Sequence, residues 1–95
     1  MPRYLVERLF HVSIDEMPKA GRRSKEVQVA HFPEITWEHS HVVVDEEGAV
    51  KTYCVYAAPS EEIVRRHADE LGLHDLQRIS EIAGDVSPND FPLVD

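Results

Sequence analysis

The sequence has a single cysteine, no long apolar run and few positive charges. Cys54 cannot form an intrachain disulfide, and a lone thiol is typical of a reducing compartment. No apolar segment approaches the about 18 residues that a membrane-spanning helix needs. The first residues also lack the apolar run of a signal peptide. We therefore expect a cytoplasmic protein with no membrane partner.

Basic residues are outnumbered by acidic ones. The chain has 10 Lys and Arg against 18 Asp and Glu, which gives a formal net charge of −8. An acidic surface repels phosphate backbones, so we expect no nucleic-acid partner. Hydrophobic residues make up 42% of the 95 residues, as is usual for a folded protein, and this length is enough for one domain, 1–95.

Sequence motifs of common enzymes are missing. The chain contains no GxGxxG, no Walker loop, no GxSxG and no HExxH pattern. Tyr56 and His39 could form a proton-transfer pair, but nothing distinguishes that role from packing. We therefore assign no catalytic residue.

Hydrophobic periodicity and capping residues predict six main elements. Ser13 or Asp15 can cap the first helix and Pro33 ends it, whereas Gly72 ends the second. The turn residues 46–49 join two strands into a hairpin. The predicted strands are 3–10, 35–45, 50–58 and 78–86, and the predicted helices are 15–31 and 59–71, followed by a tail at 87–95.

The order β-α-β-β-α-β predicts an α+β, ferredoxin-like fold, in which two helices cover one face of a four-stranded antiparallel sheet. The other face needs a partner if it is apolar, and both sides of the predicted hairpin carry apolar residues. We expect a homodimer packed sheet to sheet, with Phe91, Leu93 and Val94 of the tail covering the partner subunit. The alternative is a tail that folds back over its own sheet.

The hairpin also places histidines near the cysteine. Pairing the strands about a turn at 47–48 puts residue i opposite residue 95 − i, so His41 faces Cys54 and His39 faces Tyr56. Two imidazoles and a thiolate on one face suit nickel, zinc, copper or cobalt. The simpler interpretation is that Cys54 packs as a small hydrophobe and that the histidines are surface residues.

A further histidine, His67, falls on the apolar face of the second helix. It is either a core histidine with a backbone hydrogen bond or a fourth metal ligand. Trp37, Glu38 and Tyr56 are expected to lie in a pocket beside the site.

Four segments of the chain resemble a small bacterial family of nickel-binding proteins with a ferredoxin-like fold, formerly a domain of unknown function. The matching segments are Trp37-Glu38-His39-Ser40-His41-Val42, Tyr53-Cys54-Val55-Tyr56-Ala57-Ala58, Arg66-His67-Ala68 and Arg78-Ile79-Ser80-Glu81-Ile82. The resemblance implies a homodimer that binds nickel or a similar divalent ion through His39, His41 and Cys54, with His67 as a further matching position. Residues 15–31 and the tail depart from the family pattern.

The leading hypothesis is a nickel-type metal-binding protein that acts in sequestration or homeostasis without turnover. Two alternatives remain: a dimeric α+β barrel enzyme that acts on a small organic substrate, and a non-catalytic interaction module. A closed apolar cavity beside His39 and Tyr56 would favour the enzyme, whereas a tight polar cluster would favour metal binding.

Overall fold

The computed structural model describes residues 1–93, so the prediction for Val94 lies outside the described residues. The elements follow the predicted order, with two short 3-10 turns added. They are β1 (Arg3–Phe10), η1 (Ile14–Glu16), α1 (Met17–His31), β2 (Thr36–Val44), β3 (Val50–Ala57), α2 (Glu61–Leu71), β4 (His74–Glu81) and η2 (Pro88–Asp90).

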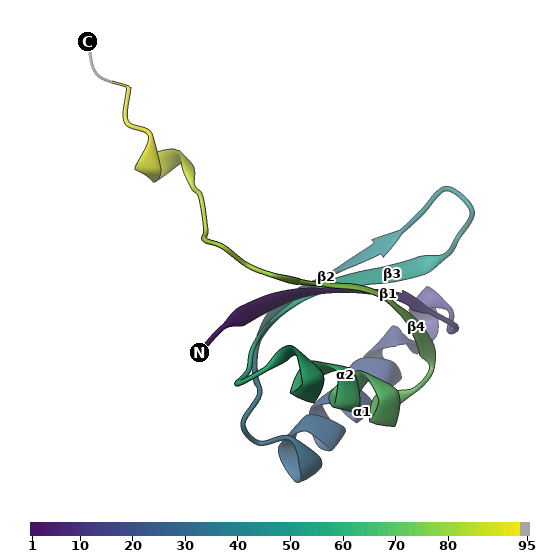
Figure 1. Ribbon diagram of the computed structural model, residues 1–95. Helices are drawn as coiled ribbons and strands as arrows, with labels where there is room; N and C mark the ends of the chain where they lie inside the picture. The colour runs from purple at the N-terminus through teal and green to yellow at the C-terminus, as the bar shows by residue number, and fades with distance from the viewer. Residues whose placement is uncertain (94–95) are drawn as a thin grey trace.

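The four strands form one antiparallel sheet in the order β2-β3-β1-β4. Both helices lie on the same side of this sheet, as Figure 1 shows. The α+β, ferredoxin-like fold is therefore confirmed. We call the uncovered side of the sheet the open face and the other side the helix face. Neither helix has the length and apolar character needed to cross a membrane, within the part of the chain that is described.

The core lies between the helix face and α2. Every second residue of β1 points toward the helices and is buried, beginning with Tyr4 and Val6. Helix α2 begins at the cap Ser60, whose hydroxyl accepts a hydrogen bond from the Ile63 amide, and it buries one apolar side against the sheet. The buried residues of that side are Val64, His67, Ala68 and Leu71.

Strand β4 differs from its predicted bounds of 78–86. It begins at His74 because Gly72 and Leu73 both have positive φ and form a tight turn, fixed by a hydrogen bond from the His11 amide to the Leu73 carbonyl. It ends at Glu81 because β1 has no further residues with which to pair. The last contact is the hydrogen bond from the Ile82 amide to the Arg3 carbonyl.

The predicted hairpin register is wrong by one residue. The loop has three residues, 46–48, closed by Asp45 and Ala49, with Gly48 at a φ of 85°. An odd loop length changes the sum of paired residue numbers from 95 to 94. As a result, Cys54 pairs with Ser40, whereas His41 pairs with Tyr53.

A β-bulge then changes the side of Trp37. Trp37 pairs with Tyr56 and His39 pairs with Val55, which leaves Glu38 as an extra residue in β2. The indole therefore lies on the helix face, where its Nε1 donates to Ser40 Oγ at 2.8 Å. The two histidines of β2 point the other way, onto the open face.

The C-terminal segment extends away from the domain (Figure 1) and does not fold back over its own sheet as far as Leu93. Its apolar side chains are exposed: Val86 by 75%, Phe91 by 65% and Leu93 completely. The open face thus has no cover from residues 1–93.

Candidate functional site

His39 and His41 form a pair on the open face of the edge strand β2. Their ring centroids are 5.5 Å apart and the rings are nearly perpendicular. Both side chains are exposed, and neither ring hydrogen-bonds to any residue in the range 1–93. Two adjacent, solvent-accessible imidazoles are suited to share one transition-metal ion.

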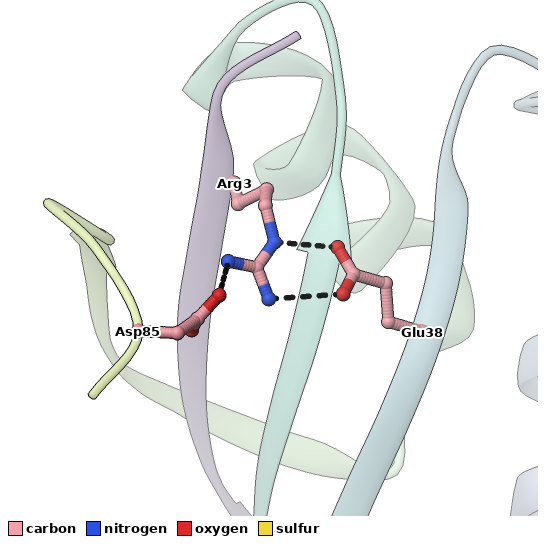
Figure 2. Close-up of polar contacts among 3 residues, drawn as sticks. All are labelled: Arg3, Glu38 and Asp85. Atoms are coloured by element: carbon pink, nitrogen blue, oxygen red, sulfur yellow. Dashed lines mark hydrogen bonds and ion pairs between the residues drawn. The ribbon is translucent and has the colours of Figure 1, made fainter. Parts of the chain in front are cut away.

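An ion-pair cluster lies next to this pair. Arg3 from β1 reaches across β3 and binds both carboxylate oxygens of Glu38, at 2.7 and 2.9 Å, as Figure 2 shows. Its third guanidinium nitrogen donates to Asp85 at 2.5 Å. The hydrogen bonds that Arg3 donates lower the pKa of Glu38, and the same bonds to the Glu38 and Asp85 carboxylates raise the pKa of Arg3. Glu38 is therefore a fixed anion that is already paired.

The other two predicted ligands lie elsewhere. Cys54 is buried on the helix face, where its sulfur is 3.8 Å from Arg8 Nη1. The predicted patch of His39, His41 and Cys54 on one side of the hairpin is not formed, because the register places the thiol on the opposite side of the sheet from the imidazoles.

His67 is fully buried between α2 and the sheet. Its Nε2 donates to the Ser24 carbonyl at 3.0 Å, and its ring makes edge-on contacts with Phe32 and Tyr56. Burial lowers the pKa of His67, so the ring is neutral near pH 7. These contacts are those expected of a core histidine. Within residues 1–93 no three His, Cys, Asp or Glu side chains gather into a group that could hold a metal ion.

A cavity of about 500 Å³ lies on the helix face, between α1 and strands β1, β2 and β3. It exists because α1 presents the small residues Ala20, Gly21 and Ser24 to this part of the sheet, and these do not fill the space. Trp37, Glu38 and Tyr56, predicted as pocket residues, all contribute to its wall, and the wall also includes His39.

Arg8 is the residue of this cavity that sequence reasoning missed. It occupies an inward-facing position of β1 between Val6 and Phe10, and its side chain is buried with only 2% exposed. Its Nη1 donates to the Tyr56 hydroxyl at 3.0 Å. Burial raises the pKa of Tyr56, so the phenol stays neutral. The feature of the sequence that could have identified it is the position of a charged residue, Arg8, among the alternate residues of β1 that are otherwise apolar.

Comparison with solved structures finds a similar fold in the C-terminal domain of the MgtC protein from Mycobacterium tuberculosis. The two share 13% sequence identity, the match covers 88% of each chain, and the TM-score is 0.59. At this identity the similarity concerns the fold alone. No curated protein sequence matches the chain.

The family comparison covers most of the chain. Residues 4–82 match the family described as "Nickel responsive protein SCO4226-like". The matched range includes both helices, all four strands except the first residue of β1, and both β2 histidines. The chain therefore belongs to the SCO4226-like family of nickel-responsive proteins.

Proposed function

We propose that this protein binds a nickel-type transition-metal ion through His39 and His41 and acts in metal sequestration or homeostasis without turnover. The observation that supports the proposal is the exposed pair of imidazoles, 5.5 Å between ring centroids, on an otherwise uncovered sheet face. Membership of a nickel-responsive family points to the same class of ion. The lone Cys54 fits the reducing cytoplasm as the place of action.

Two imidazoles supply only half of the donors that a transition-metal ion needs. A second copy of the chain, packed through its own open face, would bring a second pair of imidazoles. The open face has the apolar character that such packing requires, because Leu5, Leu9, Val43, Tyr53 and Val55 all lie on it. The exposed Phe91 and Leu93 of the tail would then cover the partner subunit. We therefore propose a homodimer with the metal between the two sheets.

The test is the metal content of tag-free protein after incubation with nickel and desalting. We expect retained nickel in the wild type, little in a H39A/H41A double variant, and wild-type amounts in a H11A/H31A control, which removes two other exposed histidines. Acid should release the metal as the imidazoles protonate. Equal retention by the double variant and the control would refute the proposed site.

The thiol provides a second test. Because Cys54 is on the helix face, C54S should keep the bound nickel. A large loss of nickel in C54S would show that the metal-bound protein pairs its strands differently, with the thiolate as a ligand. It would contradict the proposal that His39 and His41 are the ligands that each chain supplies.

The shape of the cavity bears on the enzyme alternative. A closed apolar cavity beside His39 and Tyr56 would favour the enzyme, and the helix face has an apolar cavity lined by both residues that is partly open to solvent. Within residues 1–93 no hydrogen bond joins a thiol or hydroxyl of the wall to His39 or Glu38, so we propose binding there rather than a reaction.

A further inference from the structure

We propose that the cavity between α1 and the sheet binds a small organic anion, a carboxylate with an apolar body, and that Arg8 supplies the counter-charge. The Arg8 side chain is on the opposite side of the sheet from the imidazoles of His39 and His41, and the proposal does not depend on the metal proposal.

Arg8 carries a buried charge without an ion-pair partner among residues 1–93. The guanidinium is buried, and one of its nitrogens donates to the Tyr56 hydroxyl at 3.0 Å. Its other nitrogens, Nε and Nη2, are buried without a hydrogen-bond partner, and no carboxylate of residues 1–93 forms an ion pair with it. A buried charge is costly unless an opposite charge and hydrogen bonds accompany it. An anionic group beside the guanidinium would offset this cost.

A second donor lies beside Arg8. Thr52 is the direct cross-strand partner of Arg8, so both side chains point from the sheet toward the cavity. The Thr52 hydroxyl is also buried without a partner. A guanidinium and a hydroxyl together present several N–H and O–H donors, which is the arrangement that recognises a carboxylate.

The rest of the wall defines the body of the ligand. Phe10, Met17, Ala20, Trp37 and Val42 give it an apolar lining. Glu38 is the acidic residue of the wall, and Arg3 already neutralises it. A volume of about 500 Å³ is within the range of small-molecule sites. A ligand with one anionic group and an apolar chain or ring fits this combination, whereas a polyanion does not.

Binding requires a small movement of Arg8. Its free nitrogens lie within the wall, so a rotation of the terminal torsions must turn Nη2 toward the ligand. Arg8 lines the same cavity as Gly21 and Ser24 of α1, and this cavity provides the space for the rotation.

The chain has a built-in reporter for the test. Trp37 lies in the cavity wall and is the single tryptophan, so its fluorescence reports on occupancy. Octanoate, kept below its micellar concentration, is the probe, and octanamide is the uncharged control of the same shape. We expect octanoate to bind about tenfold or more tightly than octanamide, since a hydrogen bond to a charged group gives a difference of this order. Equal binding of the two would overturn the proposal.

Variants then separate the charge from the apolar body. R8M should reduce the preference for octanoate over octanamide to about twofold or less, while R78M, which removes an exposed arginine of β4, should keep the wild-type preference. If R8M does not fold, G21L provides the test, because a leucine at this position fills the cavity and should abolish binding of both probes. Undiminished octanoate binding in either folded variant would refute the site.

The metal proposal can fail without affecting this one. H41A, which removes one imidazole of the proposed metal site, should bind octanoate as the wild type does, because its side chain is on the open face and does not line the cavity. Loss of octanoate binding in H41A would contradict the assignment of the ligand to the helix face.

Discussion

Two glycines give the sharpest test of the backbone, because the same added methyl group should have opposite effects at each. Gly21 is in the interior of α1, and Gly72 follows the end of α2 at φ 67° and ψ −161°. A Cβ built at either position meets no heavy atom within 4 Å, so steric clashes do not decide the outcome.

The backbone conformation sets the expected magnitudes. In a helix interior, alanine is more favourable than glycine by about 1 kcal/mol, so G21A should raise the free energy of unfolding by roughly 0.5–1 kcal/mol. The conformation of Gly72 is nearly restricted to glycine and costs other residues about 1–3 kcal/mol. The lower entropy of the unfolded G72A chain offsets about 0.4–1 kcal/mol of that cost. G72A should therefore destabilise the protein.

Urea unfolding followed by circular dichroism measures both free energies, and thermal melts provide a check. For a domain of this size, 1 kcal/mol corresponds to a shift in Tm of about 4–8 °C. A lower stability of G21A, or shifts of the same sign in both variants, would refute the reasoning from the backbone.

Three further predictions concern stability. Burial lowers the pKa of His67 from its ordinary value near 6.5. The free energy of unfolding should therefore be highest above pH 6.5 and should fall at lower pH, because the unfolded chain then takes up a proton that the folded protein does not. H67Q should make the free energy of unfolding depend less on pH between pH 7 and 5. Some dependence should stay because burial also lowers the pKa of His74. An unchanged pH dependence in urea titrations would contradict the assignment. D45A should lower the free energy of unfolding by about 1–2 kcal/mol, because the Asp45 carboxylate accepts hydrogen bonds from two loop amides at 2.9 Å, whereas E46A should leave chemical denaturation curves unchanged. V64A, at a fully buried position of α2, should cost about 1–3 kcal/mol by the same measurement, and a cost near zero would mean that the core collapses around the smaller side chain.

The order of the elements and most of their bounds could be predicted from the sequence because each depends on local signals. The alternation of β1, the cap Ser60 and the stop at Gly72 lie within the elements that they define. The bounds of β4 could not be predicted in this way, since its end depends on the length of β1, which is distant in the sequence.

The candidate site was harder to predict for a geometric reason. Whether His41 or Ser40 faces Cys54 depends on one residue in the loop, and loops of two, three and four residues are all compatible with the sequence Glu46-Glu47-Gly48-Ala49. The cavity could not be predicted either, because it results from small residues on α1 that meet a sheet formed by distant segments.

The three-residue loop therefore determines how residues outside the loop pair between β2 and β3. The number of residues in the loop decides which of the two proposed sites contains the imidazoles. If the same sequence formed a loop of two or four residues, His41 would pair with Cys54, so the histidines would enter the cavity while Ser40 and Val42 became surface residues. Homologous sequences can thus share every ligand residue and still differ in where those residues point, and the loop length is the feature to compare first.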